Sequence, residues 1–350
     1  MYQWFTLLLA LIFIVISSEL FCNALEHFGE KLGVSEGVTG SIFAAIATAL
    51  PETMIPILAI ISHQQNTSNN EIAAGAILGA PLMLSTLSMF LMAMSVFKQR
   101  GLTGVIKAEK TGLNRDLKFF LFVFSLVLIS ALFSNFRIST ECNYVIAIIL
   151  VTSYFMYVLI TIKESSKLVA TGHSTVADRK LLISYFLMKN NIITIAVQLV
   201  LAILMLIYFA EMFIGAVNNA ATIYKLSPFL LSLVIIPIAT ELPEKINSIL
   251  WIRRGRDTMA LANITGAMVF QGSLLPVFGM LFTPWKLMSA MHLCGMVITL
   301  LSTLWLYLNA RKNQVMVWHF LVNGMFYSIN ICVCFLISYN GRLNSCNFLG

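Results

Sequence analysis

Charged residues are scarce in this sequence. Of its 350 residues, 11% are charged and 59% are hydrophobic, and the mean hydropathy is +0.88. A soluble domain carries about 25% charged residues, so this composition excludes a soluble protein and indicates an integral membrane protein. A long polar segment is also missing, since the longest polar connection extends only from about 163 to 190. This absence argues against a signalling enzyme within the sequence.

Cysteine and histidine are few, and their spacing fits no redox or soft-metal centre. The six cysteines form no zinc or redox motif, and none of the five histidines lies beside the acidic motifs described below. Basic residues are in excess and give a net charge of +7, but their distribution is that of an orientation signal. We therefore expect no cofactor, no enzymatic activity and no nucleic-acid partner.

Long apolar runs recur along the whole sequence. The runs lack the alternation expected of barrel strands, so helices are the expected spans. The first run contains Glu19 and no convincing cleavage site, which indicates a retained helix rather than a signal peptide. The predicted fold is an all-α integral membrane protein with ten transmembrane helices of roughly 20 residues each. They lie at about 3–22, 38–61, 72–97, 118–135, 143–162, 191–215, 228–252, 258–283, 287–309 and 316–338.

The Lys and Arg residues separate between alternate connections. All but four of the 22 fall on one side of the predicted membrane, including Lys245, which we assign to the connection after the seventh run. By the positive-inside rule this side is cytoplasmic, so both termini are expected outside. The other side receives Arg137, Lys225, Lys286 and Arg342.

One motif occurs twice. The segment "IATALPETMIPI" at 46–57 closely matches "IATELPEKINSI" at 238–249, and Glu19 and Glu211 show the same offset of 192 residues as Glu52 and Glu244. A second block, "NEIAAGAILGAPLML" at 70–84, resembles "RDTMALANITGAMVF" at 256–270. Chance similarity of apolar sequence does not explain a constant offset, so we infer an internal repeat.

The repeat predicts the domain organisation. Each copy holds five spans, and an odd number forces the second copy to start on the opposite side of the membrane. Inverted-topology repeats of this kind are common in secondary transporters, where substrate sites lie near the bilayer midplane. We expect a first five-helix repeat at 1–163, a cytoplasmic linker loop at 164–190, a second five-helix repeat at 191–340 and a short tail at 341–350.

Glu52 and Glu244 are the residues of the repeat whose placement in the membrane costs the most free energy. Each follows a proline inside an apolar run, where an ionised carboxylate costs at least a few kcal/mol unless it is compensated. In one interpretation they are protonated or hydrogen-bonded packing elements. In the other, which the symmetric repetition favours, they bind a cation together. Two carboxylates about 5 Å apart repel by roughly 3 kcal/mol at an effective dielectric of 20, so one divalent ion, two monovalent ions or protons should fill the site.

Other oxygen atoms accompany these carboxylates. Thr48 and Thr240 stand one turn before the two glutamates, and the prolines free backbone carbonyls upstream; hard cations such as calcium take six to eight oxygen ligands. Glu241 is either a third ligand or proton carrier, or it faces away and pairs elsewhere or stays neutral. Asn263 and Gln271 are ligands or interhelical hydrogen-bond partners. The candidate cation-site residues are Glu52, Glu244, Thr48, Thr240, Glu241, Gln271 and Asn263.

These motifs resemble those of the cation/calcium exchanger superfamily, which includes the sodium/calcium exchangers. "ATALPET" and "ATELPEK" are similar to its Gly-Thr-Ser-Leu-Pro-Glu signature, and the second blocks to its Gly-Asn-x-x-Gly-Ser-Asn stretches. The resemblance implies ten helices, with ion sites between the second, third, seventh and eighth and with Glu52 and Glu244 as central ligands. The serine that precedes Leu-Pro-Glu in the family is Ala49 in one copy and Glu241 in the other, and the family's Gly-Asn is Gly75-Ala76 and Ala262-Asn263. The serine after the next glycine is Ala80 and Ala267, and the later polar position is Leu84 and Gln271.

The resemblance implies a secondary-active antiporter that exchanges calcium for sodium or protons by alternating access. The replaced ligands make coupling to several sodium ions doubtful and leave proton coupling open. The alternatives are a proton-coupled exchanger of another cation, a non-transporting membrane scaffold or sensor, and a channel, which inverted repeats disfavour. The expected partners are inorganic cations and the lipid bilayer, and the expected location is the plasma (inner) membrane of a prokaryote. The sequence does not indicate an oligomeric state.

Overall fold

The structure, a computed structural model, describes residues 2–49, 67–133, 139–170, 172–177, 179–186, 191–223, 241–283, 285, 290–312 and 314–346. Within these ranges the chain is helical, and its only β-structure is a pair of isolated bridges. The helical elements are α1 (Tyr2–Leu32), α2 (Glu36–Val38), the π-helix η1 (Thr39–Ala44), α3 (Ala45–Thr48), α5 (Thr67–Met83), the π-helix η2 (Leu84–Ser88), α6 (Met89–Arg100), α7 (Lys110–Phe133), α8 (Ser139–Ala170), the 3-10 helix η3 (Leu182–Phe186), α9 (Ile192–Ile223), α12 (Leu242–Arg253), α13 (Asp257–Phe282), α14 (Ala290–Lys312) and α15 (Val317–Cys346).

Eight of these helical segments are long and apolar enough to cross a bilayer. They confirm eight of the ten predicted spans. The other two, 38–61 and 228–252, extend into residues outside the described ranges, so the count of ten stays a prediction. The eight segments are Phe5–Leu32, Gly75–Arg100, Lys110–Phe133, Glu141–Ala170, Ile192–Phe213, Asp257–Phe282, Met291–Lys312 and Val317–Cys334.

Several helices are longer than the apolar runs that predicted them. α1 continues to Leu32 and α8 to Ala170, whereas the apolar runs end near 22 and 162. The added turns contain Glu and Lys, which have good helix propensity but lower the hydropathy of the segment. The predicted linker loop 164–190 therefore begins as a continuation of α8, and it also contains η3.

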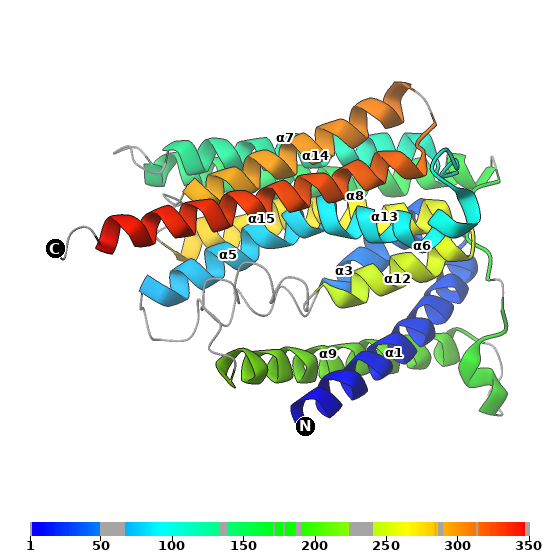
Figure 1. Ribbon diagram of the computed structural model, residues 1–350. Coiled ribbons are helices and arrows are strands. Elements are labelled where there is room, and N and C mark those ends of the chain that lie inside the picture. The colour runs from blue at the N-terminus through cyan, green and yellow to red at the C-terminus, as the bar shows by residue number, and fades with distance from the viewer. Residues whose placement is uncertain are drawn as a thin grey trace.

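The helices form a bundle and a separate helix pair (Figure 1). α13 and the continuous segment Gly75–Arg100 are the inner helices, since 78% of the most apolar window of each is buried, compared with 28% for the span of α9 and 33% for that of α1. α1 packs along α9 and runs in the opposite direction, and α12 joins this pair to the bundle (Figure 1). These two helices begin the two predicted repeats, so their antiparallel arrangement agrees with inverted topology.

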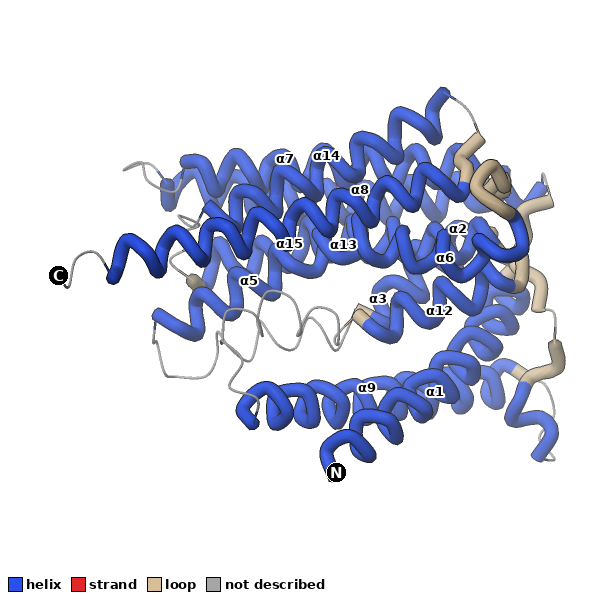
Figure 2. The backbone as a smooth tube through the Cα atoms, viewed as in Figure 1, coloured by secondary structure: helices blue, strands red, loops and turns tan. Residues whose placement is uncertain are grey.

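The basic connections gather at one end of the molecule, at the right of Figure 2. The backbone N–H of Ile106 donates to the carbonyl of Val315 at 2.8 Å, and that of Thr175 donates to Val34 at 3.0 Å. The described basic connections thus lie together as predicted, with one correction, whereas Arg137, Lys225 and Lys286 of the opposite side lie outside the described residues. Lys245 lies inside α12 with 3% exposure and does not belong to a basic connection. Which side of a membrane this end faces stays a prediction.

A close crossing between η1 and α13 positions the inner helices. A Cβ atom placed on Gly266 would collide with the backbone of Ser41, and one on Gly40 would lie 2.8 Å from the carbonyl oxygen of Met259. Small residues allow membrane helices to approach in this way, where van der Waals packing drives association. Thr48 follows this crossing on the η1–α3 side, and Asn263 lies beside it on α13.

A Gly266→Ala substitution is expected to destabilise the protein by about 1–3 kcal/mol, because overpacking forces backbone shifts. The matched control is Gly215→Ala on α9, where the residue is exposed and the added Cβ meets no described atom within 4 Å. It should be neutral or stabilise the helix by about 0.5–1 kcal/mol. Thermal unfolding of the purified proteins in detergent measures both effects. Equal melting temperatures for the parent and Gly266→Ala would contradict the crossing.

Candidate cation-binding site

Glu244 stands in the first turn of α12, and its exposure is 0%. Pro243 occupies the start of this helix, where its missing N–H is no loss. The positive end of the helix dipole favours a carboxylate at this position. The predicted span 228–252 is thus observed as a helix from Leu242, and the carbonyls expected to be freed upstream of Pro243 lie outside the described residues.

Asn263 fastens α13 to α12 next to Glu244. Its side-chain nitrogen donates to the main-chain oxygen of Glu244 at 3.2 Å and to the hydroxyl of Ser248 at 2.9 Å. The side-chain oxygen Oδ1 is buried and has no hydrogen-bond partner within the described part of the chain. Asn263 is therefore an interhelical hydrogen-bond partner through its nitrogen, and its oxygen is suited to a ligand.

Thr48 is the last residue of α3, a segment that contacts both α12 and α13. Its hydroxyl is 1% exposed and donates to the carbonyl of Ala44 at 2.9 Å. This bond uses the hydroxyl hydrogen and leaves lone pairs for a cation. Glu52 and Thr240, the partners predicted for this site, lie outside the described residues, so the convergence of the two repeated glutamates stays a prediction.

Gln271 lies further along α13. It is fully buried and eight residues beyond Asn263, which places the two amides about 12 Å apart along the helix axis. The two amides therefore lie at different heights along α13, too far apart to belong to a single ring of ligands around one ion.

Glu241 forms an ion pair that the sequence left open. Its Oε2 lies 3.1 Å from the Nζ of Lys245, one turn later on α12. Glu241 is 0% exposed and Lys245 is 3% exposed. Glu241 is thus paired within its own helix, and its role as a cation ligand or proton carrier stays a prediction. Lys245 is the residue that sequence analysis missed, although the Glu-to-Lys spacing of four residues was a usable signal.

Arginine–carboxylate pairs hold the far end of α12. Arg254 pairs with Glu19 and also lies 3.6 Å from Glu26, both on α1. Glu26 in turn accepts a hydrogen bond from the indole N–H of Trp251 at 3.0 Å. These contacts give Glu19 a structural role. They fix the register of α12, and hence of Glu244, against α1.

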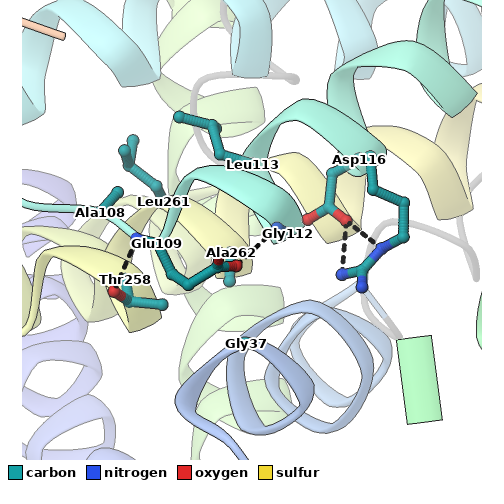
Figure 3. A pocket seen from close by; sticks show the side chains of 10 residues that line it. Gly37, Ala108, Glu109, Gly112, Leu113, Asp116, Thr258, Leu261 and Ala262 are labelled. Carbon is teal, nitrogen blue, oxygen red and sulfur yellow. Dashed lines mark hydrogen bonds and ion pairs between the residues drawn. The ribbon is translucent and has the colours of Figure 1, made fainter. Parts of the chain in front are cut away.

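The pocket in Figure 3 contains two acidic residues whose carboxylates are bound by other groups of the protein. Glu109 accepts from the backbone N–H groups of Thr111 and Gly112 at the start of α7. Asp116 accepts from Arg115 at 3.0 Å and from the hydroxyl of Thr265 at 2.8 Å. These carboxylates are satisfied by cap and ion-pair contacts, so we assign them to structure. No residue predicted for the cation site lines this pocket.

Among the described residues, no three His, Cys, Asp or Glu side chains converge as a metal centre requires. The arrangement that is described consists of one buried carboxylate, one amide oxygen and one hydroxyl on three contacting helices. Such oxygen atoms suit a hard cation.

Comparison with known families places these residues in context. The sodium/calcium exchanger protein family matches residues 2–163 and 194–337, which together exceed half of the chain. An uncharacterized membrane protein of Methanocaldococcus jannaschii is 23% identical over 321 residues, covering 89% of this chain and 91% of that protein. A protein of Alkalimonas amylolytica named as a candidate antiporter, CaxA, is 35% identical over 83 residues, covering 24% of this chain and 25% of that protein.

Solved structures of the sodium-calcium exchanger NCX_Mj share the fold. One, soaked with 2.5 mM Na+ and 0.1 mM Ca2+, superposes with a TM-score of 0.72 at 21% identity and covers 95% of this chain and 98% of that chain. Another, soaked with zero Na+ and Ca2+, gives a TM-score of 0.70 with the same identity and coverage. At this identity the likeness establishes the helical fold alone.

Proposed function

Because the chain belongs to the sodium/calcium exchanger protein family, whose members are transporters and not enzymes, we propose that it is a secondary-active antiporter. It exchanges calcium for a monovalent cation, sodium or the proton, by alternating access. The fold agrees with this function, since it matches that of a sodium-calcium exchanger along nearly its whole length.

Glu244 is the single observation that carries the proposal. Its carboxylate is fully buried in this multi-pass membrane protein, at the position that matches the Leu-Pro-Glu signature, and an acidic residue buried in a membrane protein is expected to have a function. The amide oxygen of Asn263 and the hydroxyl of Thr48 are oxygen atoms of the kind that calcium accepts. Glu52, the repeat partner of Glu244, would supply the second carboxylate and bring two negative charges to one divalent ion.

The architecture we propose is two inverted repeats, 1–163 and 191–340, with ten transmembrane helices and both termini outside. The antiparallel pairing of α1 with α9 supports it. An inverted pair gives each half the same set of contacts from opposite sides, which suits a site that opens alternately to either side.

Calcium uptake into proteoliposomes tests this function. We expect uptake when an outward sodium or proton gradient is imposed, and no uptake without a gradient. Imposing each gradient separately, with an ionophore that collapses it as the control, identifies the counter-ion. Uptake that persists without any exchanged ion would indicate a channel, and no uptake under either gradient would contradict the proposal.

A further inference from the structure

A cavity of about 200 Å³ lies at the end of the molecule where the basic connections gather. One wall is the connection that precedes α7, and the other is formed by the end of α14 and the connection to α15. Besides the bond from Ile106 to Val315, the backbone N–H of Val317 donates to the carbonyl of Gly104 at 2.9 Å. The backbones of the two connections are thus paired, and the cavity has fixed walls.

The cavity is positively charged. Lys107 and Lys110 line it, and no acidic residue of the described part of the chain does so. Neither lysine side chain forms an ion pair with a described residue. Glu109 stands between them in the sequence, but it lines the separate pocket of Figure 3, where its carboxylate is bound by backbone N–H groups. The charge of the two lysines is therefore available to an anion.

The position of the cavity is that of a membrane surface. One apolar span begins beside it at Lys110, a second ends beside it at Lys312, and a third begins beside it at Val317. At about 200 Å³ the cavity is smaller than the usual small-molecule pocket of about 300–1,000 Å³. It suits a compact charged group at the boundary between lipid and water.

The lipid-facing surface of α14 continues to this boundary. Leu301, Leu304 and Leu308 are exposed and lie on one face of the helix, and the exposed Arg311 and Lys312 follow one turn later. The two basic residues come directly after Ala310, which lines the cavity. An apolar surface that ends in positive charge complements a molecule with acyl chains and an anionic headgroup.

We propose that this cavity binds the headgroup of an anionic phospholipid. Lys107 and Lys110 attract the headgroup phosphate, and the acyl chains lie along the exposed leucines of α14. By the positive-inside rule this end is predicted to be cytoplasmic, and the cytoplasmic leaflet carries anionic lipids. No residue predicted for the cation site lines the cavity, so the inference goes beyond the proposed function and does not depend on it.

Thermal unfolding of the purified protein in detergent tests the site, with separate titrations of phosphatidylglycerol, phosphatidylcholine and inorganic phosphate at constant ionic strength. Lys107→Gln/Lys110→Gln removes the charge of the cavity. Gln314→Glu adds a negative charge at an exposed position of the lining, where folding should be unaffected. The matched control is Lys98→Gln/Lys163→Gln, which removes two exposed lysines that lie outside the cavity and form no ion pair with a described residue.

The parent should be stabilised at a lower concentration of phosphatidylglycerol than of phosphatidylcholine. In Lys107→Gln/Lys110→Gln the phosphatidylglycerol concentration for half-maximal stabilisation should rise by about tenfold or more, because two cations near an anionic headgroup are lost. Gln314→Glu should raise it as well, and this variant tests the site even where the double variant does not fold. The control pair should respond as the parent does.

Equal phosphatidylglycerol responses of the parent and the cavity variants would overturn the inference. An equally large shift in the control pair would also overturn it, because the basic end would then attract anionic lipid without using the cavity. Stabilisation by inorganic phosphate at the same concentrations as phosphatidylglycerol would replace the lipid with a soluble anion.

Discussion

Calcium flux through a Glu244→Gln variant is expected to fall by at least about 100-fold. The substitution keeps the size of the side chain and one oxygen ligand but removes a negative charge from a fully buried position. A unit charge 4 Å from another is worth roughly 4 kcal/mol at an effective dielectric of 20, and a tenfold change in affinity corresponds to about 1.4 kcal/mol. Flux in proteoliposomes under the gradient that drives the parent measures the loss.

The fold should survive this substitution. Asn263 donates to the main-chain oxygen of Glu244, which is retained, and α12 keeps its contacts with α1 through Arg254 and Trp251. The matched control is Glu211→Gln, an exposed carboxylate on α9, which should transport as the parent does. Parent-like flux through Glu244→Gln would remove Glu244 from the site. A melting temperature far below that of the parent would instead assign Glu244 to structure.

The membrane segments were predictable because burial in lipid leaves a strong compositional signal. Each of the eight spans is an apolar run that hydropathy detects without knowledge of its neighbours. The ends were harder, because turns such as those of α1 up to Leu32 are helical and polar. Hydropathy indicates which residues face lipid. It does not indicate where a helix ends, because polar residues of good helix propensity can extend the helix beyond the lipid.

The candidate site was predictable in its charges and less so in its contacts. The repeat indicated Glu244, because a carboxylate in an apolar segment costs free energy and its occurrence in both copies favours a functional role. The ion pair of Lys245 with Glu241 depends on which face of α12 the two side chains share. Assigning basic residues to connections by their charge does not reveal this. Asn263 divides its amide between a helix–helix bond and a candidate ligand oxygen. That division depends on the crossing of α12 and α13, which composition does not encode.

Ion pairs between residues far apart in the sequence were the feature least predictable from the sequence. Asp257 is the first residue of α13, where the helix dipole favours an acidic side chain. Its partner Arg100 lies 157 positions earlier, in the other predicted repeat. Nothing local selects this pair among the basic residues at that end of the molecule. The pair follows from the packing of α6 against α12, which only the folded chain reveals.

Replacing Asp257 by Asn is accordingly expected to produce the largest loss of stability among the substitutions discussed. Arg100 donates two hydrogen bonds to its carboxylate, at 2.6 and 2.8 Å, and the backbone N–H of Lys107 donates a third at 2.7 Å. The side chains of Arg100 and Asp257 are 21% and 2% exposed. Breaking a buried pair leaves one charge uncompensated and costs about 3–5 kcal/mol. Thermal unfolding of the purified protein in detergent measures the effect.

The exposed pair of Arg179 with Glu19 supplies the comparison. Its atoms lie 3.3 Å apart, but the two side chains are 63% and 29% exposed. Solvent screening reduces such a pair to less than about 1 kcal/mol, so Arg179→Gln should hardly change the melting temperature. Equal effects of the two substitutions would mean that Asp257 does not fasten the α12–α13 turn to α6. A large effect at Asp257 alone would mean that the pair with Arg100 stabilises the turn at which α12 and α13 meet.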